Sequence, residues 1–310
     1  MKSYDSGKKL TSKEAARLLG ASEASVKRWA DVGLLPSEKT AGGHRRFRPA
    51  DVALFKRENC GAAAATTTRR RQQQQRVGAN SATDGTGGAE SVEASVETLF
   101  GALTHGDTEE TSALLVKSYL DGRPLAFIFD QLLSTTMRRI GDLWHEGTLT
   151  VAEEHLATRS AISALQTLDN VVAEPVANNL LAVCCSAEDD FHELPVQCTE
   201  LVLKHEGWEV LSLGPNTPFY ALTEMVLRLH PRLVCVASTI LGDPDRAVRE
   251  FGELRAAAAR VGAAIVLGGA GFSGDNVRRR FPAELHAESF QELLDFANTL
   301  ATRHSPPDLT

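Results

Sequence analysis

One histidine of this 310-residue chain lies where a metal ligand is expected. His192 stands in the acidic segment Glu188–Pro195, directly after the first run of residues expected to form a strand in the C-terminal half. An imidazole in a loop at a strand end can bind a metal, and a carboxylate two residues earlier, here Asp190, can hold its other ring nitrogen. The pair therefore indicates a metal-ligand site, with a solvated surface histidine as the alternative.

The spacing of further motifs favours the ligand over the solvated histidine. Three short motifs follow one another at the predicted strand ends: an aspartate and histidine, a serine, and a pair of glycines. They are Asp190-x-His192-x-x-Pro195, then after 42 residues Ser238-Thr239-Ile240, then after 27 residues Gly268-Gly269. This order resembles the cobalamin-binding domain pattern of Asp-x-His-x-x-Gly, Ser-x-Leu and Gly-Gly, with a proline in place of the first glycine and an isoleucine in place of the leucine.

The resemblance implies a role for each of these side chains. His192 would replace the cofactor's own benzimidazole base on cobalt, and Asp190 would orient and polarise the imidazole. The freed nucleotide tail would then enter the sheet. There, the small hydroxyl of Ser238 can hydrogen-bond to it, and Gly268 and Gly269 allow close approach of the backbone.

The elements that must position these residues follow from the apolar pattern. From residue 178, short runs rich in β-branched residues alternate with helical stretches, which predicts a parallel sheet with helices on both faces and ligands at the carboxyl ends of its strands. Over 92–172, apolar residues at helical spacing predict four helices joined by short turns. We therefore expect a four-helix bundle over 91–174 and a doubly wound, Rossmann-like α/β domain over 175–304.

The first sixty residues predict a separate DNA-reading domain. Two short helices joined at Gly20 are a helix-turn-helix signature, and the second, Glu23–Val32, would enter the major groove. A glycine turn then leads into a predicted β-hairpin wing whose arginines can meet phosphates. The candidate DNA-contacting residues are Lys27 and Arg28 on the second helix and His44, Arg45, Arg46 and Arg48 in the wing. The alternative is a small winged domain used for protein contact.

This segment resembles the MerR-type regulators, in which two helices end in a Gly-Leu-x-Pro-like stretch before a Gly-Gly-x-Arg-x-aromatic wing. The matching residues are Gly20, Val32-Gly33-Leu34-Leu35-Pro36 and Gly42-Gly43-His44-Arg45-Arg46-Phe47. The resemblance implies a winged helix-turn-helix domain over 1–58. Metal- and drug-sensing members continue into a long dimerising helix with cysteine ligands, whereas this chain does not, so its sensor is of another kind.

The predicted bundle carries a second pattern. Trp144 and His145 lie before a helix–helix turn, and Glu154 and His155 follow it, with nine residues between the Trp and the Glu. A core tryptophan beside a capping-region Glu-His pair is the alternative. The pattern resembles that of the light-sensing, adenosylcobalamin-dependent MerR-type repressors of carotenoid synthesis. The resemblance implies that the bundle caps the upper face of the cofactor, with Trp144 on the adenosyl group, Glu154 and His155 beside it, and His145 as a second cobalt ligand after light breaks the cobalt–carbon bond.

Charge and composition agree with a basic head on an acidic body. The net charge is −7, but residues 1–60 carry 13 Lys and Arg against 7 Asp and Glu. Residues 59–90 are low in complexity and are expected to form a flexible linker. Without a long apolar run or a secretory signal, we expect a cytoplasmic protein that does not bind a membrane. Its five cysteines should then be reduced thiols.

Together these features predict a light-responsive transcriptional repressor and not an enzyme, so no residue is assigned to catalysis. The resemblance implies that the chain binds adenosylcobalamin, forms a homo-oligomer in the dark, a tetramer by family resemblance, binds operator DNA, and disassembles on photolysis of the cobalt–carbon bond. The first alternative is a cobalamin-binding regulator without photochemistry. A cobalamin-dependent mutase or methyltransferase subunit is disfavoured because such enzymes need a substrate barrel or a partner chain.

Overall fold

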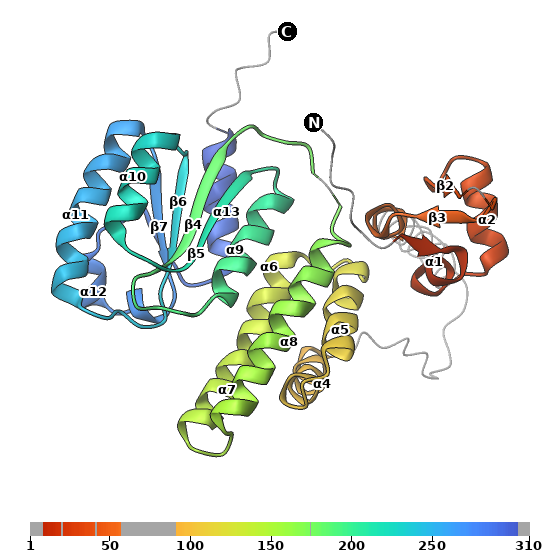
Figure 1. The fold of residues 1–310 in the computed structure, drawn as a ribbon, viewed down its shortest axis with the longest axis horizontal. Coiled ribbons are helices and arrows are strands. Elements are labelled where there is room, and N and C mark those ends of the chain that lie inside the picture. The colour runs from red at the N-terminus through yellow and green to blue at the C-terminus, as the bar shows by residue number, and fades with distance from the viewer. Residues whose placement is uncertain (1–8, 20, 41, 57–90, 174, 303–310) are drawn as a thin grey trace, which may run out of the picture.

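Three folded units follow one another along the chain (Figure 1). The computed structural model describes residues 9–19, 21–40, 42–56, 91–173 and 175–302. The linker expected over 59–90, the helix-ending Gly20 and Cys60 lie outside the described residues. The combination of a winged helix-turn-helix domain, a helical bundle and a parallel α/β domain confirms the expected multidomain fold.

The N-terminal unit is a helix-turn-helix with a small antiparallel sheet in the order β1-β3-β2. Ser22 caps the second helix, because its side chain accepts the Ser25 backbone N–H at 3.1 Å. Val26, Leu35 and Phe47 are buried and join the helices to the wing. The elements are β1 (Leu10–Thr11), α1 (Ser12–Leu19), α2 (Glu23–Asp31), β2 (Glu38–Lys39), β3 (Arg45–Phe47) and a helix over residues 49–56.

The second unit is the expected four-helix bundle, with one departure from regular helix. The third long helix contains a π-helical segment, in which backbone hydrogen bonds join residues five apart instead of four. The last helix begins at a capping box, since Thr150 and Glu153 exchange hydrogen bonds. The elements are α4 (Val92–Thr104), α5 (Thr108–Leu120), α6 (Leu125–Phe127), the π-helical segment (Ile128–Leu133), α7 (Ser134–His145) and α8 (Val151–Asp169).

The third unit is a parallel sheet in the order β5-β4-β6-β7-β8 with helices on both faces. Alternate residues of β4 face opposite layers: Ala182 and Cys184 pack with α9 and α13, whereas Val183 and Cys185 pack with α10 and α11. The strands are β4 (Leu181–Ala187), β5 (Glu209–Thr217), β6 (Leu233–Ala237), β7 (Ala264–Gly268) and β8 (Leu285–Ala287). The helices are α9 (Leu194–His205), α10 (Phe219–Leu229), α11 (Pro244–Val261), α12 (Asp275–Arg280) and α13 (Phe290–Thr302).

The strand order creates one switch point. In the sheet, β4 lies between β5 and β6. The chain leaves β4 toward β5 and leaves β6 in the opposite direction, toward β7. The loops after β4 and β6 therefore diverge at neighbouring carboxyl ends, where doubly wound folds bind ligands. Pro195 lies in the first turn of α9, where the N–H that proline lacks has no partner within the helix. The described helices include none that combines the length and the apolar character needed to cross a membrane.

Candidate functional site

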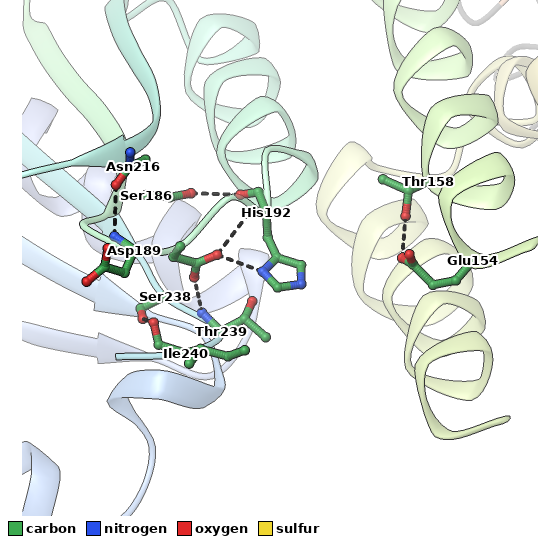
Figure 2. Close-up of polar contacts among 10 residues, drawn as sticks. Glu154, Thr158, Ser186, Asp189, His192, Asn216, Ser238, Thr239 and Ile240 are labelled. Atoms are coloured by element: carbon green, nitrogen blue, oxygen red, sulfur yellow. Dashed lines mark hydrogen bonds and ion pairs between the residues drawn. The ribbon is translucent and has the colours of Figure 1, made fainter. Parts of the chain in front are cut away.

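A buried carboxylate holds His192 at the switch point (Figure 2). Asp190 is 2% exposed, and its Oδ1 accepts the His192 Nδ1–H at 2.6 Å and the His192 backbone N–H at 2.9 Å. The other carboxylate oxygen accepts the backbone N–H of Thr239, in the loop after β6. One side chain therefore joins both loops of the switch point. Because an ionised carboxylate only accepts, the proton of the neutral imidazole sits on Nδ1 and leaves a lone pair on Nε2.

The loop around this pair has further supports that sequence reasoning missed. Ser186 donates its hydroxyl to the His192 carbonyl at 2.7 Å. Asn216, at the end of β5, accepts the Asp189 backbone N–H at 2.9 Å, and its own N–H bonds to the Asp190 carbonyl at 2.8 Å. Asp189 and Asn216 both have left-handed backbone, with φ of 65° and 53°. Their one signal in the sequence was their place at strand ends.

Hydrogen bonding shifts both members of the pair toward their charged forms. Burial opposes ionisation of Asp190, but the hydrogen bonds from His192 and Thr239 outweigh it and lower its pKa. The hydrogen bond to Asp190 raises the pKa of His192 above 6.5 against partial burial, and the charges of Asp190 and Glu154 add to it. Glu154 belongs to the bundle, so a charge on the bundle acts on the imidazole of the α/β domain.

We expect the Asp190→Asn substitution to lower the pKa of His192, measured by NMR titration of its imidazole in cofactor-free protein. The raised pKa of His192 means that the pair stabilises the fold fully below about pH 6.5 and loses this contribution as pH rises through the folded-state pKa. The lowered pKa of Asp190 adds stability above about pH 4 that is lost as pH falls. The wild type should therefore exceed Asp190→Asn in unfolding free energy most clearly between these limits.

Asp107→Asn is the matched control for this titration, since Asp107 also accepts a backbone N–H, that of Glu110 at 2.9 Å, but lies in the bundle at the start of α5. Its substitution should leave the titration of His192 unchanged. Equal His192 titration curves for wild type and Asp190→Asn would contradict the pairing of the two side chains.

The loops after β6 and β7 pack tightly against each other beside this pair. Ser238 is 1% exposed and donates its hydroxyl to the Ile240 carbonyl at 3.0 Å. A side chain at Gly269, whose φ is +92°, would collide with the Ser238 carbonyl, and one at Gly271 would collide with the Ser238 hydroxyl. A side chain at Gly268 would meet only the Ala287 carbonyl, at an ordinary 3.6 Å. The two loops therefore touch each other at Gly269 and Gly271, and sequence reasoning did not single out Gly271.

Gly269→Ala should lower the unfolding free energy by several kcal/mol. Glycine-only backbone conformations cost a substituted residue about 1–3 kcal/mol, and the collision with Ser238 adds an overpacking cost of about the same size. Gly274→Ala is the matched control, because Gly274 has φ +85° but its added Cβ meets nothing within 4 Å. Urea denaturation should show Gly269→Ala as the less stable variant; equal midpoints would contradict the tight packing.

The predicted bundle residues gather where α7 ends and α8 begins. Trp144 is 44% exposed, and its ring lies 6.1 Å from that of His145, the last residue of α7. In the first turn of α8, Glu154 accepts the Thr158 hydroxyl at 2.8 Å and the His155 Nδ1–H at 2.7 Å. Figure 2 shows the side chains of Glu154 and His192 directed toward each other across the boundary between the bundle and the α/β domain.

These side chains fit a corrinoid held between the two units. Below, the outward Nε2 of His192 is the type of donor that cobalt accepts, and the exposed side chains of Phe191 and Ile240, 71% and 60% exposed, lie in the same two loops. Above, the indole of Trp144 and the carboxylate of Glu154 offer an aromatic face and a hydrogen-bond acceptor to a nucleoside. Of the predicted cofactor residues, the structure places Glu154 of the bundle opposite His192 of the α/β domain.

The predicted DNA residues lie on α2 and the wing. Lys27, Arg28, His44 and Arg48 are exposed. Arg45 pairs with the carboxylate of Asp31 at the end of α2 and so ties the wing to the second helix, while Arg46 is half-buried on β3. Lys27 and Arg28 of α2 therefore lie on the surface of the head, where Lys27 also pairs with Glu23 at 3.6 Å.

Comparisons with known proteins agree with the helix-turn-helix unit and with the bundle. A helix-turn-helix domain model matches residues 10–60, and a B12 binding domain model matches residues 96–169. The chain is similar to two proteins of Myxococcus xanthus. It is 27% identical to the HTH-type transcriptional repressor CarH over 229 residues, covering 71% of this chain and 75% of that protein. It is 30% identical to the HTH-type transcriptional repressor CarA over 163 residues, covering 51% and 54%.

A solved structure has the same fold as the C-terminal part. The monomethylamine corrinoid protein of Methanosarcina barkeri superposes with a TM-score of 0.57 at 17% identity, covering 68% of this chain and all of that protein. This likeness concerns the fold alone. The two domain models and the sequence relatives support the resemblance to cobalamin-dependent regulators with a helix-turn-helix head.

Proposed function

We propose that this chain, a CarH-type cobalamin-dependent regulator by its domains and its sequence relatives, is a light-responsive repressor of transcription. It binds adenosylcobalamin between the α/β domain and the bundle. In the dark it forms a homo-oligomer, of four chains by family resemblance, and binds operator DNA. The cofactor would supply a cobalt–carbon bond that light can break, and the oligomer would disassemble in response.

The observation that carries this proposal is the Asp190–His192 pair, which faces Glu154 of the bundle across the boundary of the two units. His192 would bind cobalt from below through Nε2, and Asp190 would keep the ring in the tautomer and orientation that this requires. Trp144, Glu154 and His155 would cover the adenosyl group. The cofactor supplies the absorption of visible light and the bond that light breaks; the protein supplies position.

Each unit then has a defined task. While the upper group is bound, Trp144 holds the bundle in one arrangement over the α/β domain, which we propose is the arrangement that oligomerises. Loss of that group would remove the contact, and His145, beside Trp144 at the end of α7, would be the residue that can serve as a second cobalt ligand. Oligomerisation presents several heads to DNA at once, so that weak binding by single heads becomes tight binding by the assembly.

Size-exclusion chromatography and operator binding, each before and after green illumination, test the proposal. Protein loaded with adenosylcobalamin in the dark should elute earlier, and bind operator DNA more tightly, than the same sample after light. Hydroxocobalamin, which has no adenosyl group, is the matched control and should give the illuminated behaviour from the start. Cobalamin binding with an elution volume insensitive to light would instead favour the regulator without photochemistry. Failure to bind any cobalamin would overturn both.

A further inference from the structure

A carboxylate of the bundle caps a helix of the α/β domain. Asp130, in the π-helical segment, accepts the backbone N–H of Phe290 at 2.8 Å through Oδ1 and that of Gln291 at 3.1 Å through Oδ2. These are the first two residues of α13, and Ser289 accepts the third N–H, that of Glu292, at 3.1 Å. A free helix N-terminus leaves four such groups without partners, and its positive dipole favours an anion. Asp130 meets both needs from a separate unit.

Packing around Asp130 concentrates at the same point. The ring of Phe129, fully buried, meets that of Phe290 edge to face with centroids 5.6 Å apart. Cys198 of α9 is buried in the same apolar cluster as Phe129, and burial together with the charge of Asp130 raises the pKa of its thiol. Hydrogen bonds and apolar contacts thus join the π-helical segment to α13 and α9 of the α/β domain. We call this contact the junction.

The π-helical geometry belongs to this contact. Asp130 and its neighbour Phe129 both face the α/β domain, one with its carboxylate and the other with its ring. Insertions of this kind recur at functional positions in α-helices because they alter which side chains share a face. Here the segment ends at Leu133, and regular α-helix resumes in α7 and runs to His145.

Elsewhere along the boundary, α8 packs against α9 in one apolar cluster that includes Leu165, Leu168 and Leu201. A cavity of about 200 Å³ lies between α8, α9 and β5, lined by Gln166 and Asp169 of the bundle and by Gln197, Lys204 and Ser212 of the α/β domain. This space borders the packed contact of α8 with α9, so any movement of the bundle relative to the α/β domain involves both that contact and the junction.

The junction also lies at the opposite end of α7 from the cofactor residues (Figure 1). Fourteen residues separate Asp130 from Trp144, which at the helical rise is about 20 Å. A rotation of about 10° at Asp130 would move the end of α7 by roughly 3–4 Å, estimated from that same helical length. A small change at the junction would thus shift Trp144 and Glu154 relative to His192.

We propose that Asp130 is the pivot on which the bundle is set relative to the α/β domain. Its two hydrogen bonds to the start of α13 hold the π-helical segment in place while the end that carries Trp144 moves. The pivot follows from contacts of the protein alone; only its consequence for the cofactor rests on the proposed function. Asp130 is accordingly a positioning residue, which touches no ligand and acts through the placement of Trp144 and Glu154.

Distances between spin labels in cofactor-free protein test the pivot. Labels at Thr148→Cys, in the exposed turn after α7, and Glu253→Cys, exposed on α11, span the boundary. Cys60→Ser removes a background thiol, and the four described cysteines are buried. Pulsed electron–electron double resonance should give a narrow distribution of distances between these two labels in the otherwise wild-type protein. Asp130→Ala should broaden it or shift it by about 3–4 Å, as the helical lever predicts, and Asp130→Asn, which keeps one acceptor oxygen, should have a smaller effect.

Asp107→Ala is the matched control, because Asp107 caps a helix within the bundle instead of across the boundary. It should lower the melting temperature as a lost cap does and leave the distance distribution unchanged. A wild-type distribution in Asp130→Ala, with only a lower melting temperature, would overturn the pivot. If Asp130→Ala fails to fold, an unchanged distribution in Asp130→Asn overturns it equally.

Cobalamin titration separates this inference from the proposed function. If both hold, Asp130→Ala should weaken adenosylcobalamin binding at least about tenfold while Asp107→Ala does not, because only the former misplaces Trp144. If the wild type binds no cobalamin but Asp130→Ala still broadens the distances, the proposed function fails and the pivot stands.

Discussion

Replacing His192 with alanine should weaken the binding of adenosylcobalamin at least about tenfold, since loss of groups that merely support a metal ligand already costs about 10–100-fold. The substitution removes the Nε2 donor but leaves Asp190 bound to two backbone N–H groups, those of residue 192 and Thr239. The loop should therefore remain folded. Equilibrium titration monitored by visible absorbance measures the affinity, and thermal unfolding of the cofactor-free protein checks the fold.

The absorbance of whatever cobalamin the variant retains is a second readout, because the spectrum depends on the lower ligand. His105→Ala is a suitable control: His105 is exposed, and its ring hydrogen-bonds to a carbonyl of its own helix, that of Gly101 at 2.7 Å. It should bind like the wild type. Affinity and spectrum both unchanged in His192→Ala would show that cobalt takes its lower ligand from elsewhere, for example from its own nucleotide base, and the proposed site would be wrong.

Charge reversal at Arg28 should reduce operator affinity at least about tenfold, or 1.4 kcal/mol. Arg28 is exposed on α2, the helix that would enter the major groove, and glutamate there replaces attraction to phosphates by repulsion. In an oligomer each head carries the change, so the loss should be larger for the dark assembly than for single heads. Gel-shift titration at several salt concentrations measures it, and the salt dependence should become shallower by roughly one ion per lost contact.

Arg255→Glu changes the net charge by the same amount on an exposed residue of α11, far along the chain from the head. It should leave operator affinity and its salt dependence unchanged, and both variants should elute like the wild type in size exclusion. Equal losses in the two variants would mean that overall charge, and not the face of α2, governs binding to DNA.

Much of this site could be predicted because its main parts are local. Asp190 and His192 are two residues apart, and the strand that precedes them ends in a hydrophobic run, so their place at a strand end follows from the pattern alone. The same holds for the head, where Ser22 caps α2 and the wing follows a glycine turn. Side-chain period and capping act within a few residues, and the sequence displays them directly.

Contacts between distant segments could not be predicted in this way. Thr239 lies 49 residues from the carboxylate it binds, Asn216 lies 27 residues from Asp189, and Phe290 lies 160 residues from Asp130. Each depends on which loops the strand order places side by side. The tight contact of Gly271 with Ser238 has the same origin, because it depends on how the loops after β6 and β7 pack.

The amino-acid sequence alone thus determined the three units, the parallel sheet and the imidazole–carboxylate pair, because periodic burial and neighbouring side chains specify them. Tertiary structure alone decided that Glu154 of the bundle faces His192, that one carboxylate joins two loops, and that Asp130 caps a helix of another unit. The physical reason is that helix and strand patterns specify which face of an element is buried, whereas packing of whole elements decides what that face meets.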